Sequence, residues 1–296
     1  MNAYDITFLG HMCYDEITPY QVQTIVAPGS AVLCGALAAA RTGKRVAAVV
    51  KMAQADEAIL QPMRDAGIDT YLIPAAETTY SVVIHPVPDV DVRRLILKKS
   101  AGLIRTCEVP PLDTRCLHLA GISDTEFDLD LIVGLAARGY ALSADMQSFV
   151  RQVDPATREI AFRDVPNKQD IVRHLGKVKL DAVEAKVLTG TGDMGLAAQL
   201  FEQWGCPETV ITRADGVLAH VTGKTYFAPF SNRNLTGRTG RGDTTFAAYL
   251  ARRLDYGVAE SLTFAAALVS LKMEKPGPFS GTLEDVLVRM KERHST

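Results

Sequence analysis

Apolar positions along the chain alternate between short runs typical of β-strands and longer stretches with helical spacing. The strand-like runs cover residues 6–9, 46–50, 116–120, 141–144, 177–180 and 209–212. The helical stretches cover 31–41, 57–66, 128–138, 183–188 and 196–204, and three more follow at 244–254, 259–272 and 283–292. Such alternation predicts βαβ units with right-handed crossovers, and therefore a mostly parallel sheet covered by helices.

One stretch breaks this alternation and predicts a small β-sheet. From 70 to 97 the pattern is strand after strand, and the runs 80–85 and 92–97 are separated by Pro86, Pro88 and two aspartates. We expect one α/β domain over residues 1–296, with three α/β/α layers, a mostly parallel central sheet and a β lid inserted at about 70–100. An exposed lid edge leaves open a homodimer in which two lids pair.

Composition and charge narrow the class of partner. The 296 residues are 47% apolar, and 32 basic against 34 acidic residues give a formal net charge of -2. No global field recruits nucleic acid or a membrane surface, so we expect a small-molecule partner. The first residues lack the pattern of a secretory signal and no apolar run reaches about 18 residues, which predicts a cytoplasmic protein without a membrane span.

Cysteine and histidine spacing argues against disulfides and zinc. The five cysteines contain no C-x-x-C pair, and the six histidines never appear in H-x-x-x-H spacing. Reduced, buried thiols are the expected state.

The segment 236–246 carries the clearest chemical pattern. Gly240 and Gly242 permit a tight turn, and an apolar helical run follows at once. The free N–H groups and positive dipole end of such a helix form an anion pocket, and Asp243 would lie at its mouth. A carboxylate there can accept the proton of an alcohol that attacks phosphorus. The spacing alone leaves open the alternative that Asp243 only caps the helix.

The Gly240-Arg-Gly-Asp243 segment resembles the C-terminal signature of the ribokinase-like, or PfkB, carbohydrate kinases. The resemblance covers nearly the full chain, with Asp15 after an early strand and Gly29 before an alanine-rich helix. It implies magnesium-dependent transfer of the terminal phosphoryl group of ATP to a hydroxyl of a sugar, cyclitol or other polyol, or nucleoside.

The family's site residues carry over to matching positions. The resemblance implies Asp243 as the general base, and Gly240, Arg241 and Gly242 as the anion hole. It implies Asp15 and Gly29 at the substrate, Glu184 and Asp181 near Mg²⁺, and Lys179, Thr212 and Gly216 at the nucleotide. A hard magnesium ion does prefer carboxylate and water oxygens beside phosphates.

Several positions depart from the family pattern. Gly237 and Arg238 stand where the family has Asp-Thr, and Arg241 stands where it has Ala, so activation by a monovalent cation is not implied. The family's sugar-binding Asn would fall near Leu33 or Cys34.

Another segment, 143–151, is similar to the Asp-x-Gln-x-x-x-Arg segment of the branch that contains inositol kinases. That similarity implies that Gln147 and Arg151 face a polyol; the plainer interpretation makes them turn or surface residues.

Other signals indicate less. The G-x-G-x-x-G match at 190–195 follows a helix rather than a strand, so we interpret it as a helix C-cap and turn. Arg93, Arg94, Lys98 and Lys99 form a basic cluster on the predicted lid that could reach a phosphate; we interpret it instead as a solvated strand face. Two other functions stay open: a catalytically silent binding or regulatory protein on the same fold, and a kinase for a pyrimidine or vitamin alcohol.

Overall fold

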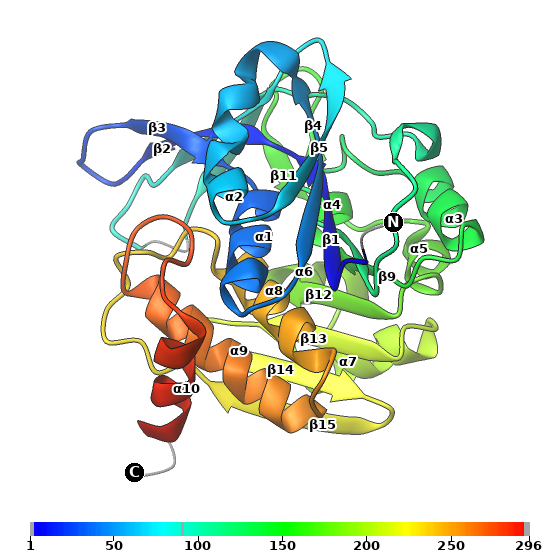
Figure 1. The fold of residues 1–296 in the computed structure, drawn as a ribbon, viewed down its shortest axis with the longest axis vertical. Helices are drawn as coiled ribbons and strands as arrows, with labels where there is room; N and C mark the ends of the chain where they lie inside the picture. The colour runs from blue at the N-terminus through cyan, green and yellow to red at the C-terminus, as the bar shows by residue number, and fades with distance from the viewer. Residues whose placement is uncertain (1–2, 90–91, 293–296) are drawn as a thin grey trace.

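A large, mostly parallel β-sheet forms the centre of the molecule (Figure 1). The computed structural model describes residues 3–89 and 92–292; residues 90 and 91, in the predicted hairpin loop, lie outside it. The nine strands lie in the order β15 (Lys224–Pro229), β14 (Gly216–Val221), β13 (Glu208–Thr212), β12 (Lys177–Asp181), β9 (Leu142–Asp145), β8 (Leu117–Leu119), β1 (Ile6–His11), β4 (Val46–Ala53) and β5 (Asp69–Ala75). Neighbours from β13 to β5 run parallel, whereas β14 and β15 are antiparallel.

Helices cover both faces of this sheet. One apolar core joins it to α1 (Ala31–Arg41), α2 (Gln61–Asp65), α8 (Arg241–Arg253), α9 (Val258–Met273) and α10 (Leu283–Glu292). A second core joins the opposite face to α3 (Leu129–Ala137), α5 (Lys168–Val172), α6 (Ala182–Thr189) and α7 (Met194–Gln203). The predicted three-layer α/β/α class is therefore confirmed. No helix in the described ranges is both long and apolar enough to cross a bilayer.

A smaller sheet lies beside one end of the large one, in the order β3 (Ile25–Gly29), β2 (Cys13–Thr18), β6 (Thr79–Ile84) and β7 (Arg94–Lys99). Only β6 and β7 come from the stretch 70–100; β5, which starts there, belongs to the large sheet. The other half comes from 13–29, where polar side chains and Pro28 hide the strand pattern. A short hairpin, β10 (Arg151–Val153) with β11 (Ile160–Phe162), contacts β7.

Several polar residues collect at one edge of the large sheet. Because β9, β12 and β13 are parallel, their carboxyl ends, at Asp145, Asp181 and Thr212, lie at the same edge. Ligands of open α/β sheets bind outside this edge. Elsewhere, Gly190 caps the C-terminus of α6 with a φ of 77°, as predicted for the glycine-rich turn.

Candidate active site

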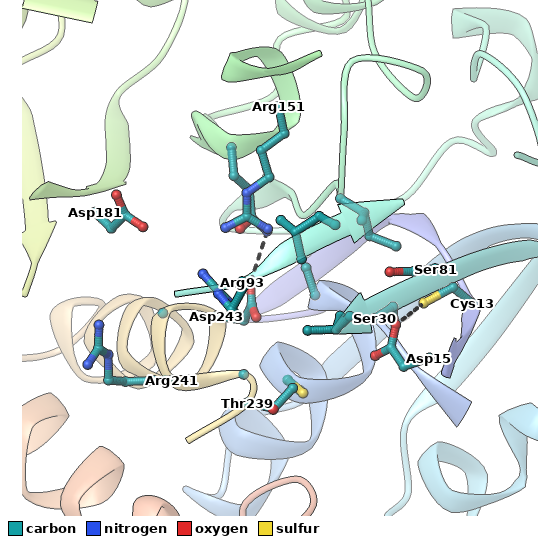
Figure 2. A pocket seen from close by; sticks show the side chains of 18 of the residues that line it. Cys13, Asp15, Ser30, Ser81, Arg93, Arg151, Asp181, Thr239, Arg241 and Asp243 are labelled. Carbon is teal, nitrogen blue, oxygen red and sulfur yellow. Dashed lines mark hydrogen bonds between the residues drawn. The ribbon is translucent and has the colours of Figure 1, made fainter. Parts of the chain in front are cut away.

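A polar cavity of about 140 Å³ lies between the small sheet, the carboxyl edge of the large sheet and the start of α8 (Figure 2). Its lining includes Asp15, Ser30, Ser81, Arg93, Gln147, Arg151, Lys179, Asp181, Thr212 and the segment from Arg238 to Asp243. In Figure 2, Asp15 and Arg241 lie on opposite sides of the cavity and Asp243 lies between them. Residues far apart in the sequence therefore meet here.

The turn before α8 has the geometry that its glycines predict. Gly240 adopts a left-handed φ of 79° and occupies the N-cap position of the helix. Arg241 N donates to the carbonyl of Arg238 at 3.1 Å, whereas the N–H groups of Gly242 and Asp243 have no i−4 carbonyl within the helix and are available to an anion. A Cβ on Gly242 would lie 2.7 Å from Lys179 Nζ, so the missing side chain lets that ammonium approach the helix start. The two features concentrate positive potential at one point.

Asp243 lies in the first turn of α8, three residues after the N-cap. Its Oδ1 accepts a hydrogen bond of 3.2 Å from Gln147 Nε2, which also donates to the carbonyl of Gly121 at 2.8 Å. Gln147 is buried in α4 (Gln147–Val150) and thereby fixes the orientation of the carboxylate. The helix N-cap is Gly240, so the capping position belongs to another residue and the Asp243 carboxylate lines the cavity.

Lys179 and Asp145 form a buried ion pair beneath the anion pocket. Lys179 Nζ lies 2.8 Å from Asp145 Oδ2, and both side chains are almost fully buried. Burial opposes the charge of Lys179, but the carboxylates of Asp145, Glu184 and Asp243 outweigh it and raise the pKa of the ammonium. Lys179 therefore stays charged at neutral pH, close to the start of α8.

Three arginines, Arg93, Arg238 and Arg241, make one wall of the cavity strongly cationic. Burial and then the neighbouring Arg241 lower the pKa of Arg238 to about 10, and burial also lowers the pKa of Arg93 and Arg241. Within the described residues, neither Arg93 nor Arg241 has a carboxylate within ion-pair distance, so these charges are poorly compensated. An anion with several charges would relieve both the desolvation and the mutual repulsion. The interpretation of Arg93 as part of a solvated face was wrong; Arg94, Lys98 and Lys99 do pair at the surface.

The small-sheet wall is acidic and hydroxyl-rich. Asp15 Oδ1 accepts from Cys13 Sγ at 3.2 Å, and burial, with the charge of Asp243, raises the pKa of Asp15. A Cβ on Gly29 would lie 1.9 Å from Asp15 Oδ2, so Gly29 leaves room for that carboxylate. Ser30 and Ser81 line the same side.

Asp181 and Glu184 are linked to each other as well as to the site. They form a capping box at the start of α6, in which each side chain accepts the other's backbone N–H at 2.8 Å. Glu184 is fully buried and its Oε1 lies 3.2 Å from Arg151 Nη2. Asp181 also lines the cavity.

The donor set fits magnesium only in a water-rich form. No group of three or more possible ligands among His, Cys, Asp and Glu is present in the described ranges. Magnesium commonly binds through one or two carboxylates plus waters and phosphate oxygens. Asp181 is the carboxylate that could serve in this way, because it lines the cavity, whereas Glu184 is outside the lining and is paired with Arg151.

Thr212 and Gly216, both predicted at the nucleotide, differ in their position relative to the cavity. Thr212 ends β13 inside the cavity lining, and its hydroxyl donates to the carbonyl of Leu180 at 3.4 Å. Gly216 begins β14, outside the lining of this cavity, where a Cβ would lie 2.5 Å from the Phe227 ring. A glycine is needed at this position because β14 and β15 pack too closely there for a side chain.

Sequence reasoning missed several side chains of this site, among them Ser30, Ser81, Asp145, Arg93 and Arg238. Asp145 stood in the quoted Asp-x-Gln-x-x-x-Arg segment, whose three named positions converge here. Arg238 was noted only as a departure from the family. Arg93 was noted in a basic cluster that could reach a phosphate but was interpreted as solvated, because its place depends on the packing of the small sheet.

Comparison with known proteins places this fold and site. No family model matches the chain. A pyrophosphate-dependent kinase in the ribokinase family, solved as a sulfate complex, is 30% identical with a TM-score of 0.88, over 95% of this chain and 99% of that chain. A structure of a pyrophosphate-dependent kinase of the same family with a pyrophosphate analogue and myo-inositol is 28% identical, with a TM-score of 0.86 over 96% and 99%.

A further relative is named for a nucleoside acceptor rather than a polyol. The cytidine kinase of Thermococcus kodakarensis is 24% identical over 256 residues, which is 83% of this chain and 87% of that protein. Fold and site thus define a phosphotransferase with an alcohol group as acceptor. The chain belongs to the ribokinase family of kinases, and the predicted family resemblance is confirmed.

Proposed function

We propose that the protein transfers a phosphoryl group from pyrophosphate to a hydroxyl of a cyclitol or similar polyol, with Asp243 as general base. The acceptor oxygen forms a bond to phosphorus, the bridging P–O bond breaks, and inorganic phosphate leaves. The acceptor proton passes to Asp243. The observation that carries the proposal is the arginine wall of Arg93, Arg238 and Arg241 beside the anion pocket.

The arginine wall favours pyrophosphate over ATP as donor. A nucleotide draws part of its binding energy from the base and ribose, whereas pyrophosphate can be held only through its phosphates. Arg238 and Arg241 are departures from the family pattern, and both add charge at the donor end. Two similar solved structures are each described as a pyrophosphate-dependent kinase. ATP, expected from the family resemblance, is the second candidate donor.

The acceptor side favours a polyol over a nucleoside. Asp15, Ser30, Ser81 and Gln147 offer hydrogen-bonding groups to several hydroxyls. Within the described part of the chain, no aromatic side chain lines this cavity, so a nucleobase would lack a stacking partner. The inositol-bound relative points the same way, while the cytidine kinase keeps nucleosides as the alternative.

Each remaining group has a defined part in the proposed reaction. Gln147 holds the Asp243 carboxylate toward the cavity. Lys179 and the N–H groups at the start of α8 stabilise charge on the transferring phosphoryl group. Magnesium, held by Asp181 and phosphate oxygens, would supply further charge neutralisation.

A homodimer through the small sheet is also proposed. β3 lies at the edge of that sheet, and Ile25 and Val26 are 60% and 52% exposed. An apolar edge strand is prone to pair with a second copy. Light scattering should give twice the chain mass, and Val26→Lys should shift it to the monomer.

The function is tested by ³¹P NMR of reactions with magnesium and either pyrophosphate or ATP. Acceptors should include inositols, sugars, nucleosides, and pyrimidine and vitamin alcohols. The proposal expects a phosphomonoester and inorganic phosphate from pyrophosphate with a polyol. Turnover with ATP but not with pyrophosphate would overturn the assignment of pyrophosphate as the donor. Ligand binding without any product would indicate the catalytically silent binder.

A further inference from the structure

Lys272 is a buried ammonium close to the anion pocket that the reaction steps above do not use. It lies in the last turn of α9 and its side chain is among the largest fully buried ones, with 2% exposure. Within the described residues, no carboxylate lies within ion-pair distance of its Nζ. Burying such a charge is costly unless other groups solvate it.

Backbone carbonyls provide that solvation. Lys272 Nζ donates hydrogen bonds to the carbonyl oxygens of Gly237 and Thr239. Both residues belong to the loop that ends at Gly240, the N-cap of α8. The ammonium therefore draws together two carbonyls of the loop that sets the position of the anion pocket.

The same loop is joined to the end of α9 by further hydrogen bonds. Gly237 N donates to the carbonyl of Met273 at 2.8 Å, and Thr236 Oγ1 donates to the carbonyl of Glu274 at 2.9 Å. A Cβ on Gly237 would lie 1.7 Å from the carbonyl oxygen of Lys275, so the contact leaves no room for a side chain. Loop and helix end behave as one unit, with the ammonium at its centre.

Converging backbone carbonyls are also the ligands that hold a monovalent metal ion. Here one amino group, attached to the chain, takes that position. Its location is fixed by α9, so it needs no ion from solution and loses no affinity when the salt changes.

We propose that Lys272 is a tethered cation that positions the anion pocket, so that turnover does not depend on a free monovalent cation. The inference rests on the proposed role of the start of α8 in the reaction. Lys272 does not touch substrate in this scheme; it is a positioning residue, acting through Gly237, Thr239 and Gly240.

The test compares Lys272→Met with the wild type in buffers whose only monovalent cation is choline, potassium or ammonium. In choline, we expect the variant to lose about tenfold or more in kcat with little change in the acceptor KM, because hydrogen bonds to a charged group are lost. Potassium or ammonium should restore much of that loss, and the wild type should be indifferent. Lys275→Met, at an exposed neighbour, is the matched control.

Several results would overturn the inference. Unchanged turnover of Lys272→Met in choline is one, and a loss that neither potassium nor ammonium restores is another. If the variant does not fold, the wild type still decides, because tenfold activation by potassium would contradict a built-in cation.

The assay uses whichever donor the wild type turns over, so a wrong donor does not affect it. If neither donor reacts, the proposed function fails separately. Calorimetric binding of inorganic phosphate, weakened in the variant and restored by potassium, would then support the inference; equal binding would reject it.

Discussion

The two walls of the cavity differ in charge. One wall, at β2, β6 and the start of α1, presents Asp15 with the hydroxyls of Ser30 and Ser81, whereas the other wall presents Arg238 and Arg241 from the turn before α8 together with Arg93, which precedes β7. A neutral polyol suits the first wall, because carboxylate and hydroxyl groups bind hydroxyls without demanding charge. A phosphoanion suits the second. The proposed reaction therefore has the polyol against the first wall and the phosphate donor against the second.

Asp243 lies where these walls meet. The anion pocket at the start of α8 faces the same point. Gln147, at the start of α4, orients the Asp243 carboxylate by donating a hydrogen bond to it. A base at the boundary can take a proton from one substrate as that substrate attacks the other. Substitutions at Asp243, Arg241 and Asp15 therefore test the proton transfer, the donor wall and the acceptor wall separately.

Removing the base should have the largest effect. Asp243→Asn keeps the shape and the hydrogen bond from Gln147 but removes the proton acceptor, so kcat should fall by about 10²-fold or more. Both KM values should change little, as measured by steady-state kinetics with each substrate varied. Near-normal turnover of a folded variant would remove Asp243 from the chemistry.

Removing one arginine of the donor wall should weaken the donor alone. Arg241→Ala loses charge-assisted hydrogen bonds of about 1.5–3 kcal/mol, so the KM for pyrophosphate should rise by at least about tenfold while the acceptor KM holds. Arg64→Ala, at an exposed arginine paired with Glu57, is the control. An equal rise in both KM values would abolish the distinction between the walls.

Removing the carboxylate of the acceptor wall should weaken binding of the acceptor alone. Asp15→Asn should raise the acceptor KM by about fivefold or more and leave the pyrophosphate KM unchanged, because a charged acceptor of hydrogen bonds becomes neutral. The matched control is Glu16→Gln, whose carboxylate binds Tyr80 and Lys98 away from the cavity. A selective effect on pyrophosphate would reverse the assignment of the walls.

The raised pKa of Asp15 predicts a small dependence of stability on pH. Burial raises this pKa above its ordinary value of 3.8, so between the two values the folded state binds more protons than the unfolded state. The wild type should therefore lose stability relative to Asp15→Asn as pH rises through this window, and the difference should be constant above the folded pKa. Thermal melts across the acidic range measure this change; a wild type that gains stability relative to Asp15→Asn as pH rises would contradict the burial of this carboxylate.

The pattern of apolar residues was sufficient for the large sheet and its helices. The strand β4 is a nearly continuous apolar run, interrupted only by Lys51, because both of its faces are covered. The strands β2 and β3 were missed because one face of the small sheet is open, so their side chains are polar or exposed. The pairing of β2 with β6 depends on long-range contacts that no local window contains.

The site was predictable where a motif is local. The turn at Gly240, Gly242 and Asp243 lies in one short segment, and its geometry follows from glycine and helix physics. The partners of that turn were not predictable, because Lys179 approaches it only through a gap at Gly242, and Arg93 arrives from the small sheet. Such meetings are set by tertiary packing.

The most direct test of the account is a crystal structure with a non-hydrolysable pyrophosphate analogue and a polyol bound together. We expect the analogue to be bound between the start of α8, Lys179 and the arginine wall. One polyol hydroxyl should lie within about 3 Å of the Asp243 carboxylate. A polyol bound against the arginines, or an analogue bound away from α8, would contradict it.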